Sequence, residues 1–197
     1  AVKRDYVTFT VDISAAYNTL PEQELVYCRP PKEWLSHRAK LGLSTTVVWR
    51  MKKLLPGRRV AATQWVEHMA SVMMKFENLN RYVGAPQLFT CMKTDLSCEL
   101  HMDDIHGTAP EDVAERFIEH LKSRAPVKKA EIHRVGDSYE FLKRRRTRYA
   151  EGMLISVNKK YIDKVIADME LDRQYLHNLK PAPTPSTTSD GVTTYYV

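Results

Sequence analysis

The chain has 197 residues, which is enough to bury a substantial core and favours one domain, with or without an appendage. Hydrophobic residues make up 43% and charged residues 27%, as in ordinary globular proteins, and no apolar run approaches the roughly 20 residues that span a bilayer. We therefore expect no membrane partner. The net charge of +6 favours polyanionic partners, above all nucleic acid.

The three cysteines, at positions 28, 91 and 98, include no Cys-x-x-Cys pair. We therefore expect neither a disulfide framework nor a structural zinc site, and we expect a reducing compartment. The chain begins at Ala1 without an initiator methionine or a signal peptide, which we interpret as a segment of a longer protein.

Residues 5–13 alternate between apolar and polar side chains, as in a half-buried strand, and Asp12 lies near the end of the polar face. The apolar face holds Val7, Phe9, Val11 and Ile13. Prolines at 21, 30 and 31 then break the pattern. For that stretch we expect an irregular segment with a short extended piece at residues 25–28.

The strongest helical pattern follows Gly57, with apolar residues at spacings of four and three: Trp65, Met69, Val72, Phe76 and Leu79. Residues 87–92 and 96–103 then have the pattern of two strands. Alternation in the second strand predicts that Asp103 ends its polar face, as Asp12 nearly ends that of the first strand. Asp104 is expected in the following turn.

The sequence Thr-Ala-Pro-Glu at 108–111 is typical of a capping box, and predicts a helix with Val113, Phe117 and Leu121 on its apolar face. Residues 138–148 and 152–157 have the pattern of a hairpin, and Asn158 can cap a helix after it. The element order predicts an α+β fold, with a ferredoxin-like antiparallel sheet and helices packed on one face.

Two adjacent carboxylates, Asp103 and Asp104, repel each other and need a counter-charge. Carboxylate oxygens suit magnesium, and two such ions can catalyse phosphoryl transfer. Because Asp12 also lies near the end of a strand, pairing of the two strands would bring the acidic groups together. On the dipeptide alone, a solvated turn is the more common alternative.

Several segments resemble, in the correct order, the polymerase palm of copia-type retrotransposon reverse transcriptases. They are VDISAAYNTL, ELVYCRPPKEW, VWRMKKLLPGRRVAATQW, LHMDDIHG, GDSYEFLKRRR, GMLISVNKKYIDKVIADMEL and KPAPTP. The resemblance implies a palm with partial fingers over residues 1–180. The Pro/Ser/Thr-rich residues 181–197 would be a linker towards a ribonuclease H part.

The resemblance also implies that Asp12 and Asp103 bind two Mg²⁺ ions, for which Mn²⁺ can substitute. Ile13 would add its backbone carbonyl, and Asp104 would be an accessory carboxylate. Tyr17 would exclude a ribose 2′-hydroxyl, with simple packing at a helix start as the alternative.

Gly57 and Arg59 would contact the incoming nucleotide or the template. A helix-starting glycine and a solvated arginine are the alternatives. His101 replaces the aromatic residue of the family's Tyr-x-Asp-Asp motif and would lie at the primer end. Lys128 or Lys129 would protonate the departing pyrophosphate, with an exposed turn as the alternative.

A basic run would bind nucleic acid beside the primer terminus through phosphate contacts, which carry no sequence information. It comprises Lys143, Arg144, Arg145, Arg146 and Arg148. An edge strand protected by charge is the alternative. Lys143 stands where the family has glycine.

The function so implied is that of an RNA-directed DNA polymerase, which adds deoxynucleotides from dNTP to the 3′-hydroxyl of a primer on an RNA or DNA template. Its other partners would be the fingers and ribonuclease H parts of the same polyprotein. It would act in the cytoplasm, in virus-like particles whose product enters the nucleus. Two alternatives stay open: a palm-like nucleic-acid-binding module without turnover, and a carboxylate-metal nuclease.

Overall fold

A computed structural model describes residues 6–14 and 16–170. This part of the chain is α+β, with antiparallel sheets and five helices. The predicted linker at 181–197 lies outside the described residues. None of the helices in the described part has the length and apolarity that crossing a bilayer requires.

The main sheet has six strands in the order β4-β5-β6-β7-β1-β8, and all its pairings are antiparallel. The strands are β1 (Val7–Ile13), β4 (Asn80–Arg81), β5 (Leu88–Cys91), β6 (Leu96–His101), β7 (Asp104–Ala109) and β8 (Val127–His133). The strand β1 therefore lies inside the sheet, between β7 and β8.

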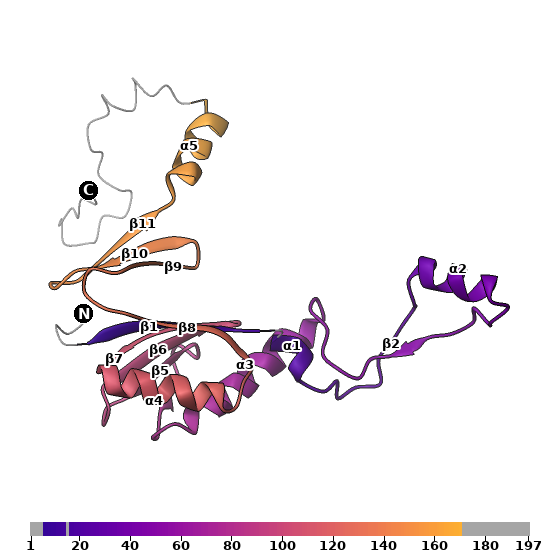
Figure 1. Cartoon of the computed structure of the whole chain (residues 1–197), viewed down its shortest axis with the longest axis horizontal. Coiled ribbons are helices and arrows are strands. Elements are labelled where there is room, and N and C mark those ends of the chain that lie inside the picture. Colours follow the sequence, from indigo (N-terminus) through magenta and orange to yellow (C-terminus); the bar gives the residue numbers. More distant parts are fainter. Residues whose placement is uncertain (1–5, 15, 171–197) are drawn as a thin grey trace.

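Two helices, α3 (Arg59–Met74) and α4 (Glu111–Lys122), cover one face of this sheet (Figure 1). The core between sheet and helices includes Phe9, Trp65 and Phe117, none more than 1% exposed. Helix α3 ends earlier than the apolar pattern suggests, but Phe76 and Leu79 still enter the core behind it. The sequence β1–α3–β6–β7–α4–β8 has β-α-β-β-α-β connectivity.

A second sheet lies over the opposite, polar face of the first (Figure 1). It contains β9 (Ser138–Phe141), β10 (Arg144–Arg148) and β11 (Met153–Val157), in the order β11-β10-β9. Polar contacts join the two sheets: the Tyr139 hydroxyl donates to Thr8 Oγ1 at 3.1 Å, and the Tyr139 ring stacks on His133 with centroids 3.7 Å apart. Helix α5 (Lys159–Asp168) follows β11, and Asn158 caps it as predicted.

The segment between β1 and α3 forms an arm that projects from the sheet (Figure 1). After the short helix α1 (Ala16–Thr19), it contains β2 (Tyr27–Cys28), α2 (Lys32–Lys40) and β3 (Trp49–Arg50). The extended piece predicted at 25–28 is confirmed by β2. Helix α2 was not predicted, because prolines at 30 and 31 interrupt the local pattern. Proline is nevertheless compatible with the start of a helix, and Pro31 is the N-cap of α2.

Two local predictions were wrong because pairing with distant strands takes precedence over local patterns, and a third was confirmed only in part. Asp104 begins β7 rather than lying in the turn, which consists of residues 102 and 103. The capping box does not form: Thr108 belongs to β7, where its hydroxyl donates to the Val7 carbonyl at 3.0 Å, and the N-cap of α4 is Pro110. The predicted hairpin with its turn at residues 149–152 is confirmed by the pairing of β10 with β11, but its first half, residues 138–148, forms two strands that turn at Leu142 and Lys143.

Candidate functional site

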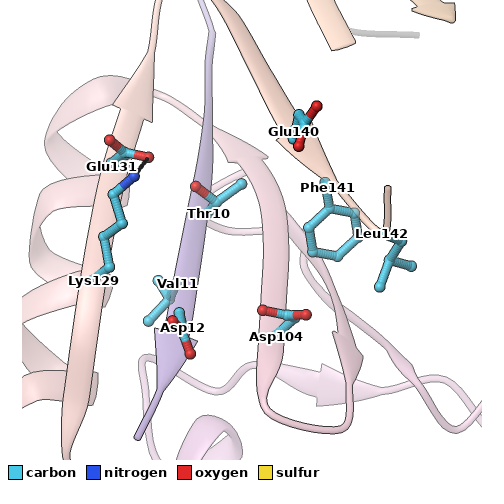
Figure 2. A pocket seen from close by; sticks show the side chains of 9 residues that line it. All are labelled: Thr10, Val11, Asp12, Asp104, Lys129, Glu131, Glu140, Phe141 and Leu142. Atoms are coloured by element: carbon cyan, nitrogen blue, oxygen red, sulfur yellow. Dashed lines mark ion pairs between the residues drawn. The ribbon is translucent and has the colours of Figure 1, made fainter. Parts of the chain in front are cut away.

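Two carboxylates face the same side of the main sheet at paired positions of neighbouring strands. The register of β1 against β7 pairs Asp12 with Asp104. Since Val11 and Ile13 point into the core, alternation directs Asp12 to the face opposite the helices. Figure 2 shows Asp12 and Asp104 at the same end of their strands. The sequence predicted that Asp12 and Asp103 would converge from two strand ends, but the strand β6 ends at His101 and the residue paired with Asp12 is Asp104.

The third carboxylate belongs to the tight turn between β6 and β7. Met102 has a φ of +58°, and Asp103 follows it in the turn. The backbone N–H of Ile13 donates to the carbonyl of Asp103 at 2.9 Å, so the turn is fastened to the end of β1. Acidic residues from two distant segments of the chain therefore lie at the same end of two central strands.

The carboxylates affect each other electrostatically. Partial burial raises the pKa of Asp104 above its ordinary value, and the negative charges of Asp103 and Asp12 raise it further. His101 and Lys128 act against this rise in the pKa of Asp104. His101, exposed at the end of β6, is the cross-strand partner of Asp104. The group thus has an excess of negative charge that a cation would relieve.

A lysine supplies part of the counter-charge. The ammonium group of Lys128 lies 3.1 Å from Asp12 Oδ2, whereas that of Lys129 lies 2.8 Å from Glu131. Both lysines belong to β8, a strand that was not predicted, and the register of β8 on β1 shifts at Asp12 and Ile13. Of the two lysines, Lys128 is therefore the one in contact with an aspartate of the site.

A cavity of about 210 Å³ opens beside Asp12 and Asp104. Its other lining residues are Thr10, Val11, Lys129, Glu131, Glu140, Phe141 and Leu142. Phe141 and Leu142 come from β9 and its turn and face the two aspartates across the opening (Figure 2). Apart from Lys129, the sequence analysis named none of these residues as part of a site. No local pattern indicates that the second sheet folds over the first.

The carboxylate oxygens of the site are ligands of the type that magnesium prefers. Within the described residues, no group of three or more His, Cys, Asp or Glu side chains is arranged to hold a metal ion by itself. Mg²⁺ commonly takes only one or two carboxylates and completes its coordination with substrate phosphates and water. Asp12, Asp103, Asp104 and the Ile13 carbonyl would supply such oxygens. An ion would have to displace Lys128 from Asp12.

Tyr17 lies next to the turn that carries Asp103. Its hydroxyl approaches Met102 Sδ at 4.0 Å, and its ring centroid is 6.5 Å from that of Trp65. The ring is partly buried against the core. Tyr17 therefore lies beside the turn at Met102 and is also packed, so both interpretations from the sequence are compatible with its position.

Gly57 and Arg59 lie where the arm meets α3. Gly57 has a φ of +94°, a conformation that favours glycine, and Arg59 is the exposed first residue of α3. Neither is among the described residues that line the cavity beside the aspartates. Their positions are accounted for by the helix start.

The predicted basic run divides into exposed and buried residues. Lys143, Arg144 and Arg145 are exposed. Arg146 is held between the sheets: its guanidinium lies 3.0 Å from the ring nitrogens of His106 and 4.7 Å from the Phe141 centroid.

Arg148, the last residue of the run, is fully buried. Its guanidinium donates to the carbonyls of Tyr6, Tyr149 and Gly152. Arg148 is therefore a structural residue, and its buried guanidinium does not belong to a contact surface for nucleic acid.

Comparison of the chain with protein-family models and with curated proteins gave no match.

Proposed function

We propose that this chain is the palm, with partial fingers, of an RNA-directed DNA polymerase of the retrotransposon type. In this proposal the β-α-β-β-α-β unit is a ferredoxin-like polymerase palm, and the arm with β2, α2 and β3 is the part of the fingers. The partners are a template of RNA or DNA with its primer, dNTP, and the fingers and ribonuclease H parts of the same polyprotein. The proposed location is the cytoplasm, in virus-like particles.

One observation carries the proposal: Asp12 and Asp104 are cross-strand partners, and the turn with Asp103 is bonded to the neighbouring Ile13. Phosphoryl transfer with divalent cations requires acidic side chains that lie close together and can bind the same ions. Asp12 and Asp104 also line an open cavity rather than lying within the core.

The residues of the chain would act by holding and orienting the reactants. Asp12 and Asp103 would bind the metal ions, with Asp104 as accessory carboxylate and the Ile13 carbonyl as an additional oxygen. Bound Mg²⁺ supplies Lewis-acid activation of the primer hydroxyl and neutralises charge on the phosphates. Tyr17 would exclude a ribose 2′-hydroxyl, and Lys128, once released from Asp12, would be close to the departing pyrophosphate. Such positioning accounts for most of the catalysis in reactions of this class.

Primer extension with Mg²⁺ tests the proposal. Asp12→Asn and Asp103→Asn should each lower the rate by about 10²-fold or more, because each removes a charged ligand from the reacting centre. Asp112→Asn, an exposed residue of α4 in an ion pair with Arg116, is the matched control and should leave the rate unchanged. Extension that persists in Asp103→Asn would refute the assignment of the site.

A nucleic-acid-binding module without turnover is the second candidate. The ion pair between Lys128 and Asp12 favours it, because it partly neutralises the acidic group without a metal ion. The same assay separates the two: salt-sensitive binding of primer and template without extension by the wild type would indicate the module. Degradation of the strand would indicate a nuclease instead.

A further inference from the structure

The turn that carries Asp103 is contacted by a buried tryptophan. Trp65 of α3 is 1% exposed, and its indole N–H donates to the carbonyl of Met102 at 2.9 Å. Met102 has a positive φ of +58°, which is unfavourable for a residue with a long side chain. A conformation of this kind persists only where the surrounding structure holds it.

Both carbonyls of the turn accept a hydrogen bond from a fixed donor. The Met102 carbonyl accepts from Trp65, and the Asp103 carbonyl accepts from the backbone N–H of Ile13 at 2.9 Å. The first donor is locked in a packed core and the second in the central strand β1. The turn is therefore held from the helix layer on one side and from the sheet on the other.

A purely structural role for Trp65 would explain why its ring is buried. It would not explain why its indole N–H donates to the carbonyl of Met102 in particular. Buried indole N–H groups need some acceptor, and any core carbonyl would serve. Here the acceptor belongs to the residue next to a carboxylate of the proposed site. Because the ring is fixed by packing, its N–H can satisfy the Met102 carbonyl in only one arrangement of the turn.

We propose that Trp65 is a positioning residue for Asp103: its indole N–H fixes the turn at Met102 and thereby holds Asp103 beside Asp12 and Asp104. The structural half of this inference is independent of the reaction. Its consequence for metal binding and catalysis rests on the proposed function.

Two variants of Trp65 remove the indole N–H and differ in how much they disturb the packing of the core. Trp65→Phe deletes it together with part of the ring. Incorporation of benzothienylalanine at position 65 replaces N–H by sulfur and keeps the bicyclic shape, so it tests the hydrogen bond if Trp65→Phe folds poorly. Phe76→Leu is the matched control, because Phe76 is also a buried aromatic residue of the core but packs against Phe117 and His120 of α4.

Amide hydrogen exchange of the segment 100–105 is the first measurement. Both Trp65 variants should speed exchange in this segment by about three- to tenfold relative to the wild type, the range expected for loss of one hydrogen bond. In Phe76→Leu, exchange in the segment 100–105 should not become faster than exchange in the other residues of β6 and β7. Equal exchange in the Trp65 and Phe76 variants would overturn the proposal, since it would reduce Trp65 to a core residue.

Binding of Mn²⁺ and primer extension give the second measurement. The Trp65 variants should weaken Mn²⁺ binding by about three- to tenfold and lower kcat while the KM for dNTP changes little. Metal affinity and kcat equal to those of Phe76→Leu would contradict the positioning role. If the wild type neither binds Mn²⁺ nor extends a primer, the proposed function fails, and hydrogen exchange alone decides whether Trp65 holds the turn.

Discussion

Gly107 shows how one residue allows the strand with Asp104 to lie against β1. A Cβ at position 107 would lie 2.3 Å from Cζ of Phe9 and 2.7 Å from Cβ of Cys98. Both neighbours are buried, so neither can move away without disturbing the core. The register that pairs Asp12 with Asp104 therefore depends on the absence of a side chain three residues further along β7.

We expect Gly107→Ala to lower the free energy of unfolding by about 1–3 kcal/mol, because it overpacks the core between β7 and Phe9. Urea denaturation measures the change. Gly152→Ala is the control: a Cβ there meets no atom within 4 Å, so its stability should be close to that of the wild type. An equal effect of the two substitutions would show that backbone freedom, and not the contact with Phe9, is responsible.

The sequence identified individual site residues where a simple alternation surrounds them. Asp12 could be placed on the polar face of β1 because apolar residues alternate on both sides of it. Lys128 and Arg148 could not be interpreted in this way. Contact of Lys128 with Asp12 depends on a register shift, and burial of Arg148 depends on its acceptors at Tyr6 and Gly152.

At the scale of elements, the hairpin of β9 and β10 has an unusual turn. Leu142 and Lys143 both have positive φ, +49° and +60°, a conformation for which two-residue hairpins normally use glycine, asparagine or aspartate. Glycine in place of Lys143 would adopt this conformation without strain.

We expect Lys143→Gly to raise the free energy of unfolding by about 0.5–1 kcal/mol, because it removes the cost of a left-handed residue. Lys164→Gly in the middle of α5 removes the same charge from an exposed helical position and should instead lower it by about 1 kcal/mol. Thermal or urea unfolding compares the two. Destabilisation by both would show that the turn is not strained by Lys143.

Elements with strong local patterns were predicted, whereas those defined by long-range pairing were not. Helix α4 has a continuous apolar face, and β1 alternates throughout, so their residues alone indicate their structure. Strand β7 contains Gly107 flanked by the polar residues His106 and Thr108, so its own sequence does not indicate a strand. It forms one because it pairs with β1 and β6. The same holds for β8, whose exposed charges resemble a turn.

At the scale of the whole molecule, the second sheet divides the polar face of the first into two parts. One part is covered and holds the polar contacts of Glu99, His106, His133 and Tyr139. The other part stays open beside Asp12 and Asp104. Residues of β10 therefore differ in their contacts according to the face on which they lie. Arg146 contacts Glu99 in the covered part, whereas Arg145 is exposed.

This division predicts opposite effects for two neighbouring arginines. If the proposed function holds, Arg145→Gln should weaken binding of a primer–template duplex and reduce the slope of log K against log salt by about one, because it would remove one phosphate contact. Its stability should change by less than about 0.5 kcal/mol. Arg146→Gln should lower the free energy of unfolding by about 1–3 kcal/mol, because Glu99 and His106 lose a half-buried charged partner. It should leave the salt slope unchanged.

Salt-dependent fluorescence anisotropy with a labelled duplex and urea unfolding of the same preparations measure both quantities. The alternation of β10 is the physical basis of the difference, since adjacent residues of a strand face opposite sides. If Arg146→Gln reduced the salt slope as much as Arg145→Gln and kept the stability of the wild type, the second sheet could not be packed on the first through Arg146 in solution. The cavity beside Asp12 and Asp104 would then lose the wall that Phe141 and Leu142 provide.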